Sequence, residues 1–243
     1  KKVFGSIVQT PNIQLVEYKW VFVRKRNEKN EIMRYKTRLA TQGFFQRFGF
    51  DYDETYSSIV DAITFRYLVN LVVCEQLDMC LMNIVTACLY ENLDNDIYMK
   101  IPEGFNMPKS CKSNSKDIHS IKWQRLLYGF KHFGYMWHNY FNECLIKEDY
   151  TNDPIYPYVV MKKNGSNFII IIVYVNDRNL IRTFEELQKA VEYLKKEFEI
   201  KDFGKTKFCL GLQIEHLEGE IFVHQTAYTY YLYLEGIKAV LYK

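Results

Sequence analysis

Apolar side chains recur at helical spacing in three separate stretches of this chain. In residues 61–76, 137–147 and 185–198 they return every three or four positions, with polar residues between them. This period places the apolar side chains on one face of a helix, so the pattern predicts three amphipathic helices.

Strand patterns lie between these predicted helices. Phe168 to Val175 is a β-branched run, followed by the turn pair Asn176–Asp177 and a return segment at 179–183, which together predict a hairpin. Two strands, 18–24 and 31–38, flank a polar turn and predict a second hairpin near the N-terminus. Further strands are predicted at 79–84, 97–101 and in a hairpin between 214 and 223.

These elements mix helices and hairpins without alternating βαβ units, which indicates an α+β fold. Residues 106–119 are polar and predict an exposed loop, and the Tyr-rich segment from Gln225 has helical character. With 48% hydrophobic and 25% charged residues, the composition is that of a globular protein. The length suits one large domain or two small lobes.

Several protein classes are disfavoured by what the sequence lacks. The longest apolar run, 168–175, is far shorter than the roughly 20 residues of a membrane span, so we expect no membrane partner. No secretory signal is present, and the absence of an initial Met suggests a fragment. Six scattered cysteines without metal-ligand spacing indicate reduced thiols and an intracellular protein, cytoplasmic or nuclear.

Charge is segregated along the chain although the net charge is only +3. Residues 19–47 hold nine Lys/Arg against Glu28 and Glu31, whereas 48–98 hold nine Asp/Glu and only Arg66. A basic lobe beside an acidic lobe suits a protein that binds a polyanion with one part and metal ions with the other. Two solvated surfaces with chance segregation would give the same pattern, so both interpretations stay open.

Short motifs in a fixed order resemble the reverse transcriptase of Ty1/copia retrotransposons. Each is weak alone, but their shared order over about residues 19–225 makes coincidence implausible. They are K-W-V-F at 19–22, R-Y-K-T-R-L-A at 34–40, G-F-F-Q at 43–46, D-Y-D-E-T-Y-S at 51–57, I-Y-M with P-E-G-F at 97–105, L-Y-G-F-K at 127–131 and Y-V-N-D at 174–177.

The resemblance implies a right-hand polymerase fold with a fingers hairpin, a ferredoxin-like palm and a partial thumb. Its domains would be an N-terminal lead-in at 1–18, fingers at 19–60, palm with intervening fingers segments at 61–210 including the loop 106–119, and the start of the thumb at 211–243. The integrase and RNase H parts of such a Pol polyprotein are absent from this chain.

The implied activity is RNA-directed DNA synthesis, in which two Mg²⁺ ions assist nucleotidyl transfer to a primer 3′-hydroxyl. The family holds these ions with three carboxylates, and the matching positions here are Asn83, Asn176 and Asp177. Only Asp177 is a charged metal ligand, so the charge of the set falls from −3 to −1. We therefore expect impaired catalysis and doubtful Mg²⁺ binding, although Asn176–Asp177 is also ordinary turn chemistry.

Other family positions would bind the nucleotide. Lys36 and Arg38 occupy alternate positions of a strand and match a basic pair that faces the triphosphate. The alternative is a solvated strand face. Cys88 stands where the family has a bulky aromatic residue beneath the sugar, which predicts weaker exclusion of a 2′-hydroxyl.

Three further residues match the primer and template region. Tyr128 and Trp137 could stack near the bases, although buried aromatic residues are the alternative. Gly211 follows Leu210 where a primer strand would pass, and glycine permits close backbone approach.

Three hypotheses follow. The chain is a reverse transcriptase domain with little or no activity on a template–primer of RNA or DNA with dNTPs; or it is a non-enzymatic nucleic-acid-binding remnant or domesticated polymerase-like domain; or it is a decayed fragment without a stable fold. Salt-dependent binding without synthesis separates the second from an active enzyme, and cooperative unfolding argues against the third.

Overall fold

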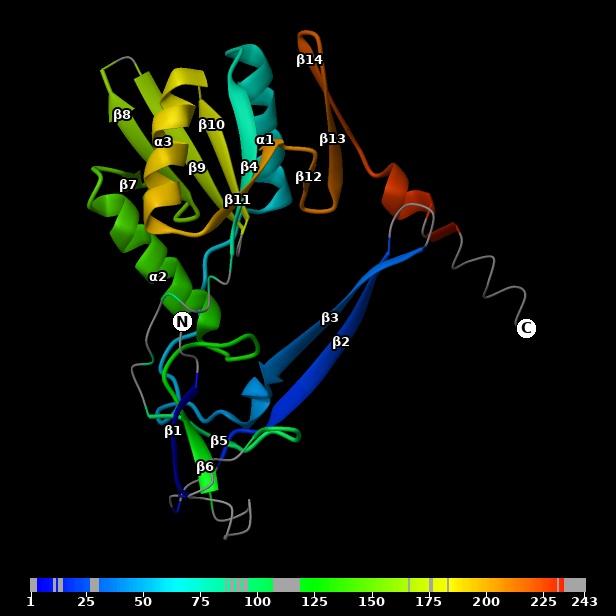
Figure 1. Cartoon of the computed structure of the whole chain (residues 1–243). Helices are drawn as coiled ribbons and strands as arrows, with labels where there is room; N and C mark the ends of the chain where they lie inside the picture. Colours follow the sequence, from blue (N-terminus) through cyan, green and yellow to red (C-terminus); the bar gives the residue numbers. More distant parts are fainter. Residues whose placement is uncertain are drawn as a thin grey trace. The chain divides into compact units, whose positions relative to one another are not determined.

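The computed structural model describes all residues except 1–3, 11, 13–14, 27–30, 86, 88–89, 91–92, 94–95, 107–118, 166, 175–176, 183, 231 and 234–243. Helices and antiparallel strands are mixed without a regular βαβ order, which confirms the predicted combination of α and β structure (Figure 1). The chain forms two compact units, residues 1–57 with 86–141 and residues 58–85 with 142–243. In the part of the chain that is described, no helix is long and apolar enough to cross a membrane.

The first unit contains a long two-stranded hairpin of β2 (Tyr18–Arg26) and β3 (Ile32–Thr41). Both strands run further than the pattern predicted, and their register extends to the pair of Tyr18 and Thr41. The predicted turn at 27–30 lies outside the described residues. The hairpin pairs with no other strand among the described residues.

A small sheet and an aromatic core form the body of the first unit. Its strands are β1 (Phe4–Gln9), β5 (Tyr98–Lys100) and β6 (His119–Trp123), in the order β1-β6-β5. Short 3₁₀ helix η1 (Gly43–Phe45) follows the hairpin. One buried core cluster of this unit contains Val16, Ile97, Met99, Trp123, Leu126, Phe130 and Met136.

A six-stranded antiparallel sheet forms the centre of the second unit, with the order β11-β4-β10-β9-β8-β7. The strands are β4 (Asp78–Ile84), β7 (Thr151–Asn152), β8 (Val159–Asn164), β9 (Asn167–Tyr174), β10 (Asp177–Arg182) and β11 (Ile200–Lys205). β9 lies inside the sheet, and its residues 169–173 are all buried. A run that is apolar on both faces therefore packs against covering layers on both sides.

Helices provide those layers. α1 (Ala62–Cys74) packs on the face that carries Met79, Ile172 and Ile181, and α3 (Phe184–Glu197) crosses the opposite face (Figure 1). The first of these faces also contacts a small sheet of β12 (Phe208–Cys209), β13 (Leu212–Leu217) and β14 (Glu220–His224). Both helices match the predicted ranges closely, whereas α2 (Phe133–Ile146) begins before the predicted start at Trp137.

Asp61 is the N-cap of α1. Its carboxylate accepts hydrogen bonds from the backbone N–H groups of Ile63 at 2.7 Å and Thr64 at 3.0 Å. It also accepts from the hydroxyl groups of Thr64 at 2.7 Å and Tyr158 at 2.8 Å. These donors stabilise the ionised carboxylate, led by the Thr64 hydroxyl, and they hold the pKa of Asp61 well below its usual range.

This cap predicts a pH dependence of stability. Because the folded pKa of Asp61 is depressed, its contribution is present above the unfolded value of about 3.9 and is lost as the pH falls below it. We expect Asp61→Ala to lower the urea midpoint at pH 7, since the helix loses its cap. Asp61→Asn keeps an acceptor, so its midpoint should fall less at pH 7 and depend less on pH below 5. Equal midpoints for Asp61→Ala and the parent protein would contradict the assignment.

Candidate functional site

Strands β9 and β10 flank the Y-V-N-D motif at residues 174–177, which contains two of the expected catalytic positions. β10 begins at Asp177, which pairs directly with Tyr174 at the end of β9. The two-residue connection, which includes Asn176, lies outside the described residues, so the role expected for Asn176 stays a prediction. The pairing of Tyr174 with Asp177 nevertheless shows that β9 and β10 are paired up to these residues.

Asn83 lies beside Asp177 across the next strand pair. The register of β4 and β10 places Asn83 directly opposite Asp177. Directly opposed residues in an antiparallel pair have Cα atoms about 4.5–5.5 Å apart. Two of the three residues expected at the catalytic positions, separated by more than ninety positions in sequence, are thus brought together by backbone pairing.

A fourth strand brings a residue that sequence reasoning missed. β11 pairs with the other edge of β4, and Lys201 is directly opposite Asn83. One row across four strands therefore contains Tyr174, Asp177, Asn83 and Lys201. β11 is exposed at every position after Ile200, so it lacks the alternation that marks a half-buried strand.

The residue types in this row do not fit a pair of Mg²⁺ ions. Mg²⁺ prefers several hard oxygen ligands, and two nearby +2 ions need carboxylates to offset their repulsion. The row offers one carboxylate residue, one amide and one ammonium. Within the described residues, no group of three or more His, Cys, Asp or Glu is placed to hold a metal ion.

A buried polar network lies next to the row, further along β10 on the same face of the sheet. Asn179, two residues after Asp177 on β10, accepts a hydrogen bond at 2.9 Å from the hydroxyl of Thr206 and donates one at 3.3 Å to the sulfur of Cys209. His216 in β13 contacts the carbonyl of Thr206 at 2.8 Å. These contacts connect β10 to the small sheet β12–β14, and because they are buried they favour one fixed arrangement.

Gly211 lies in the turn between β12 and β13. Both turn residues have positive φ, 52° at Leu210 and 76° at Gly211. A Cβ atom added at Gly211 would meet no atom within 4 Å. The left-handed backbone therefore accounts for glycine here, and contact of this turn with a primer stays a prediction.

Lys36 and Arg38 share one face of the hairpin, opposite Val23 and Val21. The guanidinium carbon of Arg38 lies 5.6 Å from the ring centroid of Tyr128. Tyr128 also accepts, through its carbonyl, a 2.9 Å hydrogen bond from the backbone N–H of Thr41. The structure thus brings together Arg38 and Tyr128, which the sequence assigned separately to nucleotide and to primer or template.

Trp137 is almost fully buried, with 2% of its surface exposed. Its indole packs against the rings of Tyr90, Tyr140 and Phe141, with centroids 5.8 to 6.1 Å away. This is the buried-aromatic interpretation that the sequence left open, and a contact of Trp137 with nucleic acid stays a prediction. Cys88 lies outside the described residues.

Two of the resembling motifs interlock at the base of the hairpin. A Cβ at Gly43 would lie 2.2 Å from the carbonyl oxygen of Gly129, and a Cβ at Gly129 would lie 2.0 Å from the carbonyl oxygen of Thr41. The side chain of Gln46 accepts a 2.8 Å hydrogen bond from the backbone N–H of Lys131. These motif residues position the hairpin through backbone contact, because no larger side chain fits between the segments.

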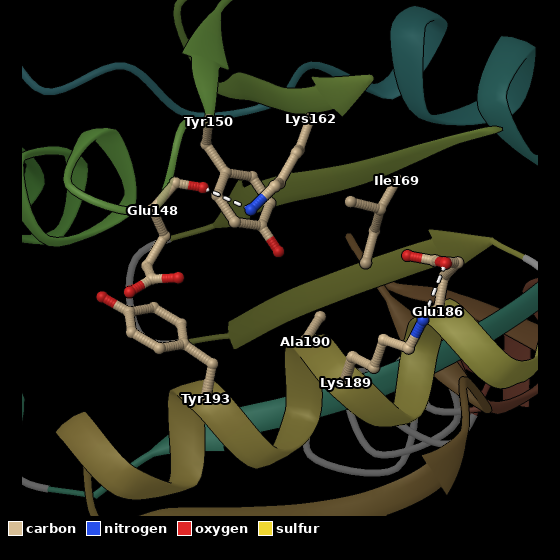
Figure 2. Close-up of a pocket in the computed structure, with 8 residues that line it drawn as sticks. All are labelled: Glu148, Tyr150, Lys162, Ile169, Glu186, Lys189, Ala190 and Tyr193. Carbon is tan, nitrogen blue, oxygen red and sulfur yellow. Dashed lines mark hydrogen bonds and ion pairs between the residues drawn. The ribbon is translucent and has the colours of Figure 1, made fainter. Parts of the chain in front are cut away.

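Away from this row, a pocket of about 230 Å³ lies between β8, β9, α3 and the segment after α2 (Figure 2). Its lysines are engaged, since Lys162 donates to the carbonyl of Glu148 at 2.7 Å and Lys189 pairs with Glu186 at 3.2 Å. Burial raises the pKa of Tyr150 to about 12, so this phenol is neutral at pH 7. None of the expected site residues lines the pocket, and nothing in it favours acid–base chemistry.

The interlocked glycines give a stability prediction. Gly129→Ala combines φ of 99° with the clash at Thr41, whereas Gly49→Ala at φ of 77° has open space around it. We expect Gly49→Ala to cost about 1–2 kcal/mol and Gly129→Ala to cost a further 1–3 kcal/mol, roughly, for the forced shift. Urea unfolding of both variants tests this, and equal losses would refute the close backbone packing.

Comparison with known proteins gives one consistent result. Residues 1–234 match the family described as "Reverse transcriptase (RNA-dependent DNA polymerase)". The chain is 31% identical over 214 residues to "Retrovirus-related Pol polyprotein from transposon TNT 1-94" of Nicotiana tabacum, covering 86% of this chain and 16% of that polyprotein. It is 24% identical over 220 residues to the Pol polyprotein from transposon RE1 of Arabidopsis thaliana, covering 89% and 14%. The chain thus spans 16% or less of these relatives' length.

Proposed function

The chain belongs to the reverse transcriptase (RNA-dependent DNA polymerase) family, and we propose that it is the template–primer-binding polymerase domain of a copia-type Pol polyprotein with strongly impaired nucleotidyl transfer. In this proposal β2–β3 are the fingers hairpin, the six-stranded sheet is the palm, and the thumb begins near Gly211. The observation that carries the proposal is the register of β4 and β10, which sets Asn83 opposite Asp177.

The binding half of the proposal rests on the hairpin. Lys36 and Arg38 share a face, and a guanidinium can hold two phosphate oxygens at once. The ring of Tyr128 beside Arg38 restricts where that guanidinium lies. We assign the pair to the triphosphate of the incoming dNTP. We further assign Lys201, which pairs with Asn83 at the end of the row on β11, to a phosphate of the primer or nucleotide.

The chemical half concerns charge. In nucleotidyl transfer the primer 3′-hydroxyl gives up its proton to a base or to water, its oxygen bonds to the α-phosphorus, and the bond to pyrophosphate breaks. Negative charge on the attacking oxygen before the bond forms, and on the leaving oxygen as its bond breaks, must be stabilised. Relatives in this family generally use Mg²⁺, but the row here, with Asn83 beside Asp177 and Lys201, does not fit two such ions. Loss of one group that stabilises developing charge typically removes about 3–4 kcal/mol, or 10² to 10³ in rate. Losses within one catalytic unit are strongly non-additive, so the first already removes most of the activity.

A second candidate function is nucleic-acid binding without synthesis. The hairpin keeps its cations, five of them on one face, while the expected carboxylate row contains an amide at Asn83. Binding to phosphates needs only the cations of the hairpin, since it depends on the release of counterions from the nucleic acid. Tight, salt-dependent binding by a protein that stays silent even after the carboxylates are restored would favour this function over the first.

Primer extension tests the main proposal. We expect the chain as it stands to extend a DNA primer on an RNA template weakly or not at all in Mg²⁺ or Mn²⁺. The Asn83→Asp/Asn176→Asp variant should be at least about 10²-fold faster. Asn83→Ala/Asn176→Ala is the matched control, since it changes the same positions without adding charge.

The outcomes separate cleanly. The proposal is supported if Asn83→Asp/Asn176→Asp is active while the parent protein and Asn83→Ala/Asn176→Ala are silent. In that case the chain still binds its substrates and lacks only the carboxylates. Substantial synthesis by the parent protein contradicts the proposed impairment. A silent double-Asp variant that unfolds cooperatively and binds template–primer contradicts the assignment of Asn83 and Asn176.

Nucleotide binding gives a separate prediction. In the Asn83→Asp/Asn176→Asp background, Arg38→Met should raise KM for dNTP about 10-fold or more, because a charge-assisted phosphate contact is lost. Lys163→Met removes an exposed cation of β8 in the other unit and should leave KM unchanged. Steady-state extension at varied dNTP measures both, and an unchanged KM in Arg38→Met would remove this residue from the triphosphate site.

A further inference from the structure

The two faces of the hairpin β2–β3 differ in chemistry. Because directly paired residues project to the same face, the register assigns every side chain to one face or the other. The basic face carries Lys19, Lys25, Arg34, Lys36 and Arg38 with Val21 and Val23. The aromatic face carries Trp20, Phe22, Arg24, Tyr35, Thr37 and Leu39.

The aromatic face is covered at its base and open beyond it. Leu39 and Tyr18, at the base, pack against the buried core of the first unit. Further out, Phe22 is 75% exposed and Tyr35 is 71% exposed, and Trp20 between base and tip is 38% exposed. Two large rings held in water on a regular strand pair indicate a surface that is completed by a ligand.

The geometry suits stacking. Phe22 lies opposite Thr37 and Tyr35 lies opposite Arg24, so the two rings stand on diagonal positions of adjacent strands. Diagonal neighbours are about 7–8 Å apart, a separation that long aromatic side chains can adjust. Arg24 stands directly beside Tyr35 on the same face, where a cation can meet the phosphate that links two stacked bases.

Charge selects the class of ligand. Five cations on the reverse face and Arg24 on the aromatic face give the hairpin a strong positive potential. A polyanion that also offers flat apolar rings matches this combination of positive charge and exposed aromatic rings, and unpaired nucleic acid has this chemistry. We propose that Trp20, Phe22 and Tyr35 form a stacking platform for the unpaired bases of a nucleic-acid strand, while Arg24 on the same face contacts its phosphates.

The platform distinguishes single strands from duplex. In a duplex the flat faces of the bases are already stacked on one another, so exposed rings find partners only on unpaired nucleotides. The proposal rests on the polymerase assignment for its biological substrate, which would be the unpaired template strand. Binding itself is measured without any synthesis, so either proposal can fail alone.

Trp20 provides a built-in reporter. The chain has three tryptophans, and the other two, Trp123 and Trp137, are each 2% exposed. Fluorescence quenching of the full chain by oligo(U) or oligo(dT) of twelve nucleotides therefore reports contact with the aromatic face. We expect saturable quenching by these single strands and much weaker quenching by a duplex of the same length.

Variants separate stacking from charge. Phe22→Ser/Tyr35→Ser should weaken single-strand binding about 10-fold or more and leave the slope of log K against log salt unchanged, because no cation is removed. Arg24→Met should reduce that slope by about 0.7 for one lost phosphate contact. The matched control is Phe44→Ser/Phe48→Ser, which removes two rings that are 72% and 71% exposed in the same unit but lie outside the hairpin.

Four results would overturn the proposal. They are the absence of Trp20 quenching, equal affinity for duplex and single strand, an equal loss of affinity in the Phe44/Phe48 control, and dissociation of a self-associated parent protein by Phe22→Ser/Tyr35→Ser in sedimentation. The last result would identify the face as an interface between copies of the chain. Cooperative unfolding of each variant at the parent midpoint confirms that the fold is retained.

Discussion

The pairing of β4 with β10 is the constraint on which the candidate site depends. Side chains alternate between faces along a strand, so a slip of one residue would exchange the two faces of the whole strand. Both faces of these strands are apolar and covered, with Met79 and Ile181 under α1 and the small sheet and Leu180 buried on the other side, so the apolar pattern alone does not exclude the slip. Polar contacts favour one register, because Thr206 donates its N–H to the carbonyl of Met79 on β4 and its hydroxyl to Asn179 on β10. The same register sets Asn83 opposite Asp177.

A different constraint holds the hairpin. Its strands pair only with each other among the described residues, so its direction depends on the base, where Gly43, Gly129 and Thr41 make backbone contact and Gln46 bonds to the backbone of Lys131. Backbone contact of this kind leaves no flexible side chain to absorb a change. Rigid support at the base lets the outer part of the ribbon carry cations and exposed rings, which contribute little to its own stability.

The elements best predicted from sequence are those whose pattern reflects burial on one face or both. α3 shows a clear helical period, and β9 is a β-branched run; both were placed within one or two residues. β11 could not be found in this way, because it is exposed at all but one position and is held only by pairing with β4. Lys201 was missed for that reason. It lies in the row only because β11 pairs with β4 in this register, and the sequence of β11 alone does not reveal that pairing.

The candidate site itself was reached through resemblance, and the structure adds what resemblance lacks. Periodicity alone would have given Asn83 no significance, since one polar residue in an apolar strand has no partner in the local sequence. Pairing supplies the neighbours, Asp177 on one side and Lys201 on the other. An amide has nearly the shape of a carboxylate, so Asn83 fits the strand pairs without adjustment. With an amide at position 83, the charges of Asp177 and Lys201 nearly cancel, whereas a carboxylate there would put two negative charges side by side. Gathering carboxylates opposes folding unless cations bind them. In the proposed site, amides in place of carboxylates remove that opposition together with the proposed metal ligands. The fold and the proposed nucleic-acid-binding surface can therefore be retained after the proposed chemistry is lost.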